Sequence, residues 1–194
     1  MALVGFKRMT IRILDGAATP TLGTNLFVIE GQANKGATRT AKISGLASDP
    51  VKTYGSNIAY HVSSRGVGDV KMETTAVDIP IEVITKILGH QVTDDIIGIG
   101  ANTQAPYCSV MLESATPAGV MASIGFFKGQ FSMDAEELET LKDKQEELPD
   151  DSLSFAAVAS DDKVTEDLYV IKYFGKDEEK LKKFKGQLKM VTAG

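Results

Sequence analysis

Residues 70–89 read Val70-Lys-Met-Glu-Thr-Thr-Ala-Val-Asp-Ile-Pro-Ile-Glu-Val-Ile-Thr-Lys-Ile-Leu-Gly89, and the spacing of their apolar side chains changes halfway. In the first half, less polar residues occupy every second position, as in a half-buried strand. These residues are Val70, Met72, Thr74 and Ala76. In the second half the apolar residues recur every three or four positions, which is typical of an amphipathic helix. The stretch therefore predicts a strand over 67–78 followed by a helix over 79–88.

The predicted helix has a signal at each end. Asp78 is the expected N-cap, and Pro80 suits the first turn, where a missing N–H costs nothing. Gly89 is expected to end the helix, because glycine readily adopts the left-handed conformation that follows a last helical turn. Between them the apolar stripe consists of Ile81, Ile84, Ile87 and Leu88. We expect this stripe to pack on a sheet.

Alternating or β-branched segments on both sides of this stretch predict further strands. They lie at 3–14, 26–30, 39–44, 58–63, 107–114, 120–131, 153–159 and 168–174. A short second helix is predicted over 177–186, because acids fill its first turn and lysines its last. Strands greatly outnumber helices, so the expected fold class is mainly β (α+β).

Three segments lack a clear pattern. Residues 45–57 are rich in turn formers and predict a long ordered loop, and residues 92–101 also look like a loop. Residues 135–148 have good helix propensity but lie between strand-like segments, and tertiary context can override propensity. For these we favour an extended hairpin, and a helix stays open.

The composition is that of a folded domain. The chain has 194 residues, 43% of them hydrophobic, and one cysteine. A chain of this length buries a sizeable core without disulfides or metals. A single cysteine excludes an internal disulfide and a Cys-rich zinc site. No stretch is long and apolar enough for a membrane span or a secretion signal, so neither is expected.

The charge is unevenly distributed. Residues 1–132 carry a net +1, residues 133–167 a net −10, and residues 168–194 a net +4. This pattern argues against a general nucleic-acid binder, which needs a concentrated basic face. It leaves room for charge complementarity between copies of the chain.

Two glycine motifs are weak signals for nucleotide binding. The segment from Gly31 to Gly36 has P-loop glycine spacing, but Ala37 stands where the motif needs its phosphate-binding lysine, before Thr38. We interpret it as a hairpin loop. Gly98-Ile-Gly100 begins like a dinucleotide fingerprint, but Thr103 stands at the third glycine position.

Other candidates for chemistry also favour structural roles. His61 lies in a predicted strand, His90 follows the predicted helix, and Cys108 lies in an alternating strand. Adjacent acids in turns are usually solvated, and we interpret Asp94-Asp95, Asp150-Asp151 and Asp161-Asp162 in this way. We therefore predict no enzyme activity and no catalytic, cofactor-binding or metal-ligating residue.

The order of several motifs resembles a known family. They are Val4-Gly-Phe-Lys-Arg8, Asp78–Gly89, Pro106-Tyr-Cys-Ser-Val-Met-Leu-Glu-Ser114, Phe126-Phe-Lys-Gly-Gln-Phe-Ser132, Glu137-Leu-Glu-Thr-Leu-Lys142 and Asp151-Ser-Leu-Ser-Phe155. Together they resemble the major tail protein, or tail tube subunit, of long-tailed non-contractile bacteriophages of the siphophage type.

The resemblance implies an antiparallel β-sandwich of two sheets with one flanking helix at about 79–88. It implies a structural subunit, six copies of which join into a ring, and rings that stack into the channel for DNA ejection. It covers a tail-tube domain at 1–175, and the lysine-rich segment 176–194 is expected to form no separate domain. The implied partners are further copies, tape measure, tail terminator and distal tail proteins. The chain would be made in the host cytoplasm and reside in the virion tail, without a membrane, while DNA passes without specific binding.

Two sets of candidate site residues follow. The acidic block is our candidate channel lining, because carboxylates repel phosphates, although a solvated outer face is the alternative. Its residues are Asp134, Glu136, Glu137, Glu139, Asp143, Glu146 and Glu147. The loop that the resemblance implies to reach a neighbouring ring contains Asp49, Pro50, Lys52, Tyr54 and Asn57.

Three alternative functions stay open. The tube or distal-ring protein of a contractile injection system would share the fold and differ in partners. A small hydrolase using His61 with a turn acid would instead show a cleft with convergent polar groups. The third alternative is a monomeric β-sandwich binding module.

Overall fold

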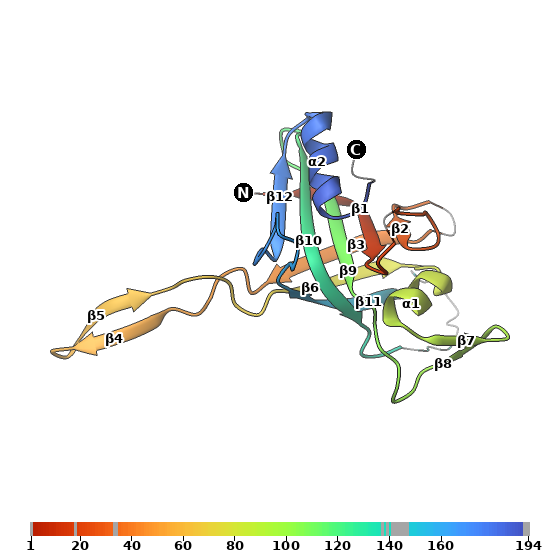
Figure 1. The fold of residues 1–194 in the computed structure, drawn as a ribbon, viewed down its shortest axis with the longest axis horizontal. Helices are drawn as coiled ribbons and strands as arrows, with labels where there is room; N and C mark the ends of the chain where they lie inside the picture. The colour runs from red at the N-terminus through yellow and green to blue at the C-terminus, as the bar shows by residue number, and fades with distance from the viewer. Residues whose placement is uncertain are drawn as a thin grey trace.

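Antiparallel strands dominate the computed structural model, which describes residues 2–17, 19–32, 35–136, 138, 140 and 148–191 (Figure 1). The main-sheet strands are β1 (Val4–Ile13), β2 (Leu26–Ile29), β3 (Ala37–Ser44), β6 (Lys71–Val77), β9 (Cys108–Ala115), β10 (Met121–Ser132), β11 (Asp150–Val158) and β12 (Val170–Phe174). Two small pairs are β4 (Val51–Gly55) with β5 (Ile58–Ser63), and β7 (Gln91–Thr93) with β8 (Ile96–Gly98). The helices are α1 (Ile81–Leu88) and α2 (Glu178–Gln187). The predicted fold class, mainly β with a flanking and a C-terminal helix, is confirmed.

The two layers of the sandwich belong to one continuous sheet. Its strand order is β2-β1-β9-β10-β11-β6-β3, and β12 lies beside β10. The first half of β10 pairs with β12 through Ala122–Phe126, and its second half pairs with β11 through Lys128–Ser132. The strand β10 therefore belongs to both layers, whereas the resemblance implied two separate sheets.

The core lies between these layers and under α1. Apolar side chains of β1, β6, β9, β10 and β11 form one buried cluster with the inner face of α1. At its centre the ring of Phe155 lies 4.8 Å from that of Phe131 and 5.6 Å from that of Phe126. Burial of these rings is a large part of the hydrophobic stabilisation of the fold.

The structure confirms the predicted C-terminal end of α1 but not its predicted start. Gly89 has a left-handed conformation, and a Cβ there would overlap the carbonyl of Gln104. The prediction of Asp78 as N-cap is wrong, because Asp78 lies in a positive-φ turn and Pro80 occupies the N-cap position. Among the described residues no side chain caps this end of the helix, and the residue before Pro80 is held to β11 instead: Ile79 N–H donates to Asp151 Oδ2 at 2.9 Å.

The C-terminal helix and the residues after it cover the second face of β9 and β10. Phe184, Leu188 and Met190 form a small apolar cluster with Met111 and Phe127. Ser109 Oγ donates to the carbonyl of Leu188 at 2.6 Å.

This C-terminal segment helps to bury residues 9–13 of β1 on both faces, where the alternation predicted a half-buried strand. The guanidinium of the fully buried Arg12 donates to carbonyl oxygens around it, those of Ile13, Ala17, Asn25 and Lys189. A buried cation needs such partners, so Arg12 fastens the C-terminal segment to the sheet.

Several loop predictions need correction. The predicted loops 45–57 and 92–101 contain strands, β4 in the first and β7 and β8 in the second. The segment from Gly31 to Gly36 is not a hairpin loop, because β2 and β3 lie at opposite ends of the strand order. Most of 135–148 lies outside the described residues.

Candidate assembly surfaces

The most prominent surface feature is an arm, residues 46–67, that projects far from the body (Figure 1). Its strands β4 and β5 pair with each other alone, and they turn at Ser56 and Asn57, which both have positive φ. Two consecutive positive-φ residues form the hairpin turn whose twist matches that of the strands. The strands are exposed along their whole length.

The root of the arm is held by hydrogen bonds. Gly68 N–H donates to the carbonyl of Gly45 at 2.9 Å, and Ser48 Oγ donates to the carbonyl of Arg65 at 3.0 Å. A Cβ on Gly45 would overlap the carbonyl of Asp69, so only glycine permits this closure. The arm therefore leaves the body at a fixed place between β3 and β6.

The arm exposes large apolar side chains that contribute nothing to the core. Tyr60 is 80% exposed, and Val51, Tyr54, Ile58 and Val62 are exposed as well. An isolated two-stranded hairpin is marginally stable in water, and contiguous exposed apolar surface marks interaction sites. The arm therefore has the properties of an interaction element whose partner is another molecule.

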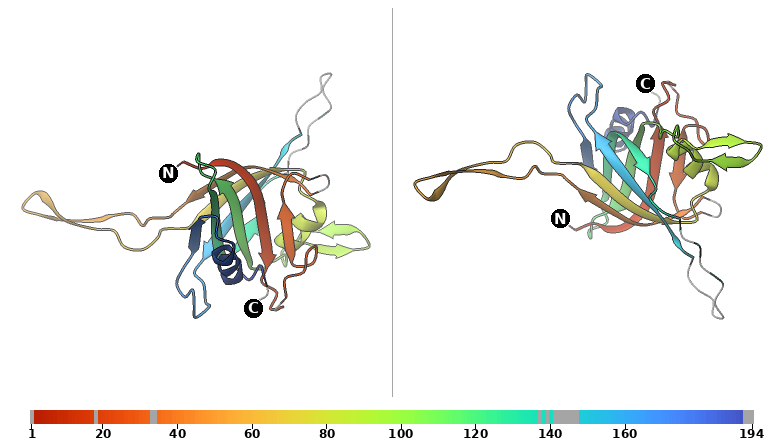
Figure 2. Two further views of the ribbon diagram at one scale, coloured as in Figure 1. Left: turned by 90° about the horizontal axis from the view of Figure 1, so that it is seen from above. Right: turned by 90° about the horizontal axis from the view of Figure 1, so that it is seen from below.

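A second exposed hairpin, the short hairpin (residues 91–99), projects from the opposite end of the molecule (Figure 2). It contains β7, β8 and Ile99, and its turn at Asp94 and Asp95 again has two positive φ values. Its exposed apolar residues are Val92, Ile96, Ile97 and Ile99. The two ends of the long axis thus carry similar apolar elements.

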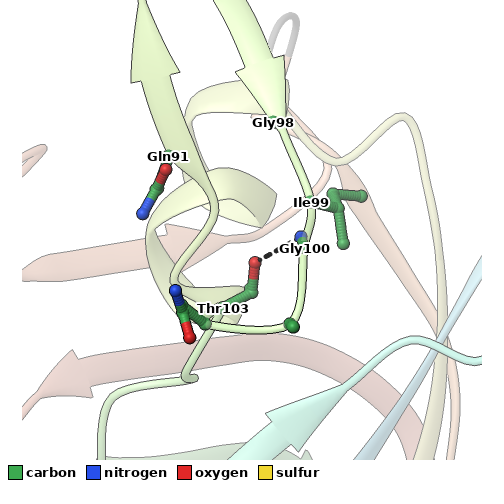
Figure 3. Close-up of a pocket in the computed structure, with 7 residues that line it drawn as sticks. Gln91, Gly98, Ile99, Gly100 and Thr103 are labelled. Carbon is green, nitrogen blue, oxygen red and sulfur yellow. Dashed lines mark hydrogen bonds between the residues drawn. The ribbon is translucent and has the colours of Figure 1, made fainter.

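A small recess of about 200 Å³ lies beside the short hairpin (Figure 3). It is lined by Gln91 and residues 98–103, and Gly100 N–H donates to Thr103 Oγ1 at 2.9 Å. This turn uses the glycines that resembled a dinucleotide fingerprint, and Thr103 N–H returns a hydrogen bond to the Gly100 carbonyl. The segment is a closed turn instead of the strand-to-helix turn that holds a pyrophosphate.

The outer face of β3, β6 and β11, which we call the polar face, is different in character. The hydroxyl groups of Thr40 and Thr75 form a hydrogen bond of 2.7 Å, and Lys42 Nζ lies 3.5 Å from Glu73 Oε2. Next to them β11 exposes Ser152, Ser154 and Ala156. The charged pair Lys42 and Glu73 is balanced and the uncharged side chains named here are short, so this face is hydrophilic without a strong net charge.

The predicted site residues divide into two groups. Asp49, Pro50, Lys52, Tyr54 and Asn57 are all exposed on the arm. Of the acidic block, Asp134 and Glu136 are exposed just after β10. The other five, Glu137, Glu139, Asp143, Glu146 and Glu147, lie outside the described residues. Sequence reasoning missed Ile58, Tyr60 and Val62 of the arm and the whole short hairpin.

The candidates for chemistry are dispersed. His61 is exposed on the arm, and His90 follows α1 at the other end of the molecule. Burial raises the pKa of the Cys108 thiol to about 12, so the thiolate needed for reactivity is scarce at neutral pH. Among the described residues, no three His, Cys, Asp or Glu side chains could hold a metal ion. None of the helices in these ranges is long and apolar enough to cross a membrane.

Comparison with known proteins gives the architecture its context. The family model described as phage tail tube protein matches residues 1–192, almost the whole chain. No curated protein matches the sequence. A match of this extent includes both hairpins, the polar face and the C-terminal helix, and it confirms the resemblance that the sequence motifs carried. The chain belongs to the phage tail tube protein family, as a structural component of a siphophage-type virion tail.

Proposed function

We propose that this chain is the repeating subunit of a tail tube, in which six copies form a ring and stacked rings form the channel for DNA ejection. The observation that carries the proposal is the arm, a fully exposed apolar hairpin on a chain of the tail tube family. An exposed apolar element of this kind is a liability in a monomer and an advantage in an assembly. The role is structural and not enzymatic.

The free edges of the sheet support ring formation. The strand β12 pairs with β10 on one side only, and β2 and β3 end the strand order. An unpaired edge readily joins another strand, and a closed ring of copies pairs edges without leaving an open end. We infer that edges join copies within a ring, while the arm acts between rings.

The channel lining is proposed to combine the polar face with the acidic block. The block connects β10 to β11, two strands of the layer that carries the polar face. The carboxylates of the acidic block repel DNA phosphates within a Debye length of about 8 Å. The paired charges and hydroxyl groups of the polar face form no cationic patch that would bind DNA. Such a wall lets DNA slide without specific binding.

The remaining roles follow from the tube. Residues 1–175 would form the tail-tube domain, and the lysine-rich segment 176–194 would be packed on it without forming a domain of its own. Tape measure, terminator and distal tail proteins would contact the tube along its lumen and at its ends. Synthesis would take place in the host cytoplasm.

Self-association of the purified chain tests this proposal. We expect light scattering to show particles that grow with concentration, because an obligate subunit interface buries more than about 2,000 Å² in total. Negative-stain images should show rings or tubes. Particles that stay monomeric at high concentration, and also in the presence of tail-initiation proteins, would refute the assembly role.

Reversing the charge of the block tests the channel lining. Replacing Asp134, Glu136, Glu139 and Glu146 by lysine should give tails that assemble but retain DNA, because a cationic wall binds phosphates and releases their counterions. Ejection should recover steeply as salt rises. The control is Glu82→Lys with Glu179→Lys, on exposed positions of the two helices. If the block variant ejects DNA like the control, these carboxylates do not line the channel.

A further inference from the structure

The arm and the short hairpin lie at opposite ends of the molecule. Both ribbon views place the arm at one end of the longest axis and β7–β8 at the other (Figures 1 and 2). Their exposed residues share a chemical type, since the arm presents Tyr54, Ile58 and Tyr60 and the short hairpin presents Ile96 and Ile99. A copy placed end to end would bring one element against the other.

The charges of the two elements are complementary. The arm carries Lys52 and Arg65 against Asp49, a net +1. The short hairpin carries Asp94 and Asp95 at its tip, a net −2, and no cation. An arm meeting an arm, or a short hairpin meeting a short hairpin, brings like charges together. Contact between an arm and a short hairpin is therefore favoured electrostatically. Charge complementarity determines which partner is chosen more than it determines how tightly the partner binds.

The recess beside the short hairpin suits an aromatic side chain with a polar tip. It is lined by the side chains of Gln91, Asn102 and Thr103 together with glycine backbone. The side-chain amides of Gln91 and Asn102 are exposed and make no hydrogen bond within the described part of the chain. Tyrosine combines an apolar ring with a hydroxyl that needs a partner. The arm carries two such residues near its turn, Tyr54 and Tyr60.

We propose that the arm of one subunit docks on the short hairpin and its recess in a second copy, which belongs to the next ring. The inference rests on the proposed tube function and names the receptor surface that the arm needs. Each subunit offers one arm at one end and one receptor at the other, so the contact is heterologous. A heterologous contact that also advances each copy along an axis does not close on itself and repeats without limit along that axis. This repetition turns a finite ring into a tube.

Site-directed cross-linking tests the contact. We would prepare Tyr60→Cys, Ile96→Cys and the chain with both changes, assemble them into tubes, and treat them with a short bis-maleimide. The buried thiol of Cys108 leaves the native chain a suitable background. The two sites lie at opposite ends of one molecule, so any link between them joins two copies.

The expected result has three parts. The chain with both cysteines should give a ladder of covalent multimers, since every junction between rings can be linked. An assembly of mixed single variants should give dimers and no larger species. Each single variant alone should stay monomeric on a denaturing gel.

Three other outcomes overturn the proposal in distinguishable ways. If tubes form but Tyr60→Cys and Ile96→Cys are not cross-linked, the arm contacts another surface and only the proposed receptor is refuted. Cross-links in the Tyr60→Cys chain alone show that arms meet arms. A wild-type chain that never assembles refutes the tube function and this inference with it.

Discussion

Replacing Ile84 by aspartate should destabilise the subunit by more than about 3 kcal/mol, because an unpaired charge would enter an apolar contact. Ile84 is 6% exposed, on the face of α1 that joins the main core. Total stabilities of small domains are about 5–15 kcal/mol, so a loss of this size leaves a marginal protein. Thermal unfolding followed by circular dichroism measures the effect.

The matched control is Ile81→Asp on the same helix. Ile81 is 57% exposed and lies in the first turn, where a carboxylate interacts favourably with the helix dipole. Its stability should change by less than about 0.5 kcal/mol. If Ile84→Asp melts cooperatively at the wild-type temperature, α1 is not packed as described.

Removing the arm should abolish tube formation and leave the fold of the subunit intact. The change replaces residues 49–64 by Asn-Gly, which suits a two-residue turn between Ser48 and Arg65. No residue of the arm is buried, so the melting temperature should stay near that of the wild type. Negative-stain microscopy should show isolated rings or smaller species at concentrations where the wild type forms tubes.

Point variants separate the apolar contribution from the loss of chain length. Ile58→Asp with Tyr60→Asp should act like the deletion, because both exposed apolar side chains become charged. The control, Thr53→Asp with Ser63→Asp, adds the same charge at polar positions of the same strands. Its tubes should form at nearly the wild-type concentration. Normal tubes from the arm-deleted chain would show that stacking does not use the arm.

Local patterns were sufficient to predict most of the fold. The change of period at Asp78 located both β6 and α1, and Gly89 gave the helix end, because these signals act within a few residues. Asp177 likewise caps α2 by accepting hydrogen bonds from the N–H groups of Glu179 and Lys180. Local capping is readable when the capping side chain is near in sequence. The start of α1 was misassigned because no side chain in the described part of the chain caps it, and the segment before it is held by Asp151, which lies far along the chain.

Long-range burial could not be read from the same patterns. Arg12 alternates with apolar residues and looks solvent-facing, yet α2 and the loops around it bury it completely. The small hairpins were predicted only in part, since 58–63 was expected to be a strand and β4, β7 and β8 were not. The turns, Ser56-Asn57 and Asp94-Asp95, contain no glycine, and β4, β7 and β8 are exposed on both faces, so no buried apolar side marks these three strands.

The candidate site was predicted in outline only. The resemblance identified the right segment of the arm and named Lys52 and Tyr54, which the structure exposes together. The predicted loop ended at Asn57, because Ile58–Ser63 was expected to be a separate strand. The receptor proposed for the arm depends on which elements share an end of the molecule, and that depends on tertiary structure.

The way in which the arm joins the body has a mechanical consequence. Strands β3 and β6 run into the arm along its own direction, so a pull on the arm is carried directly into these strands (Figure 1). The ladder between β6 and β11 extends from Val77↔Asp150 to Lys71↔Ala156, and a force parallel to the strands loads its hydrogen bonds together as shear. Bonds that share a load must break almost simultaneously, whereas bonds that are peeled break one at a time. A tube built on this joint would resist stretching far better than the small size of each arm suggests, and bending strain between rings would be spread into the sheets.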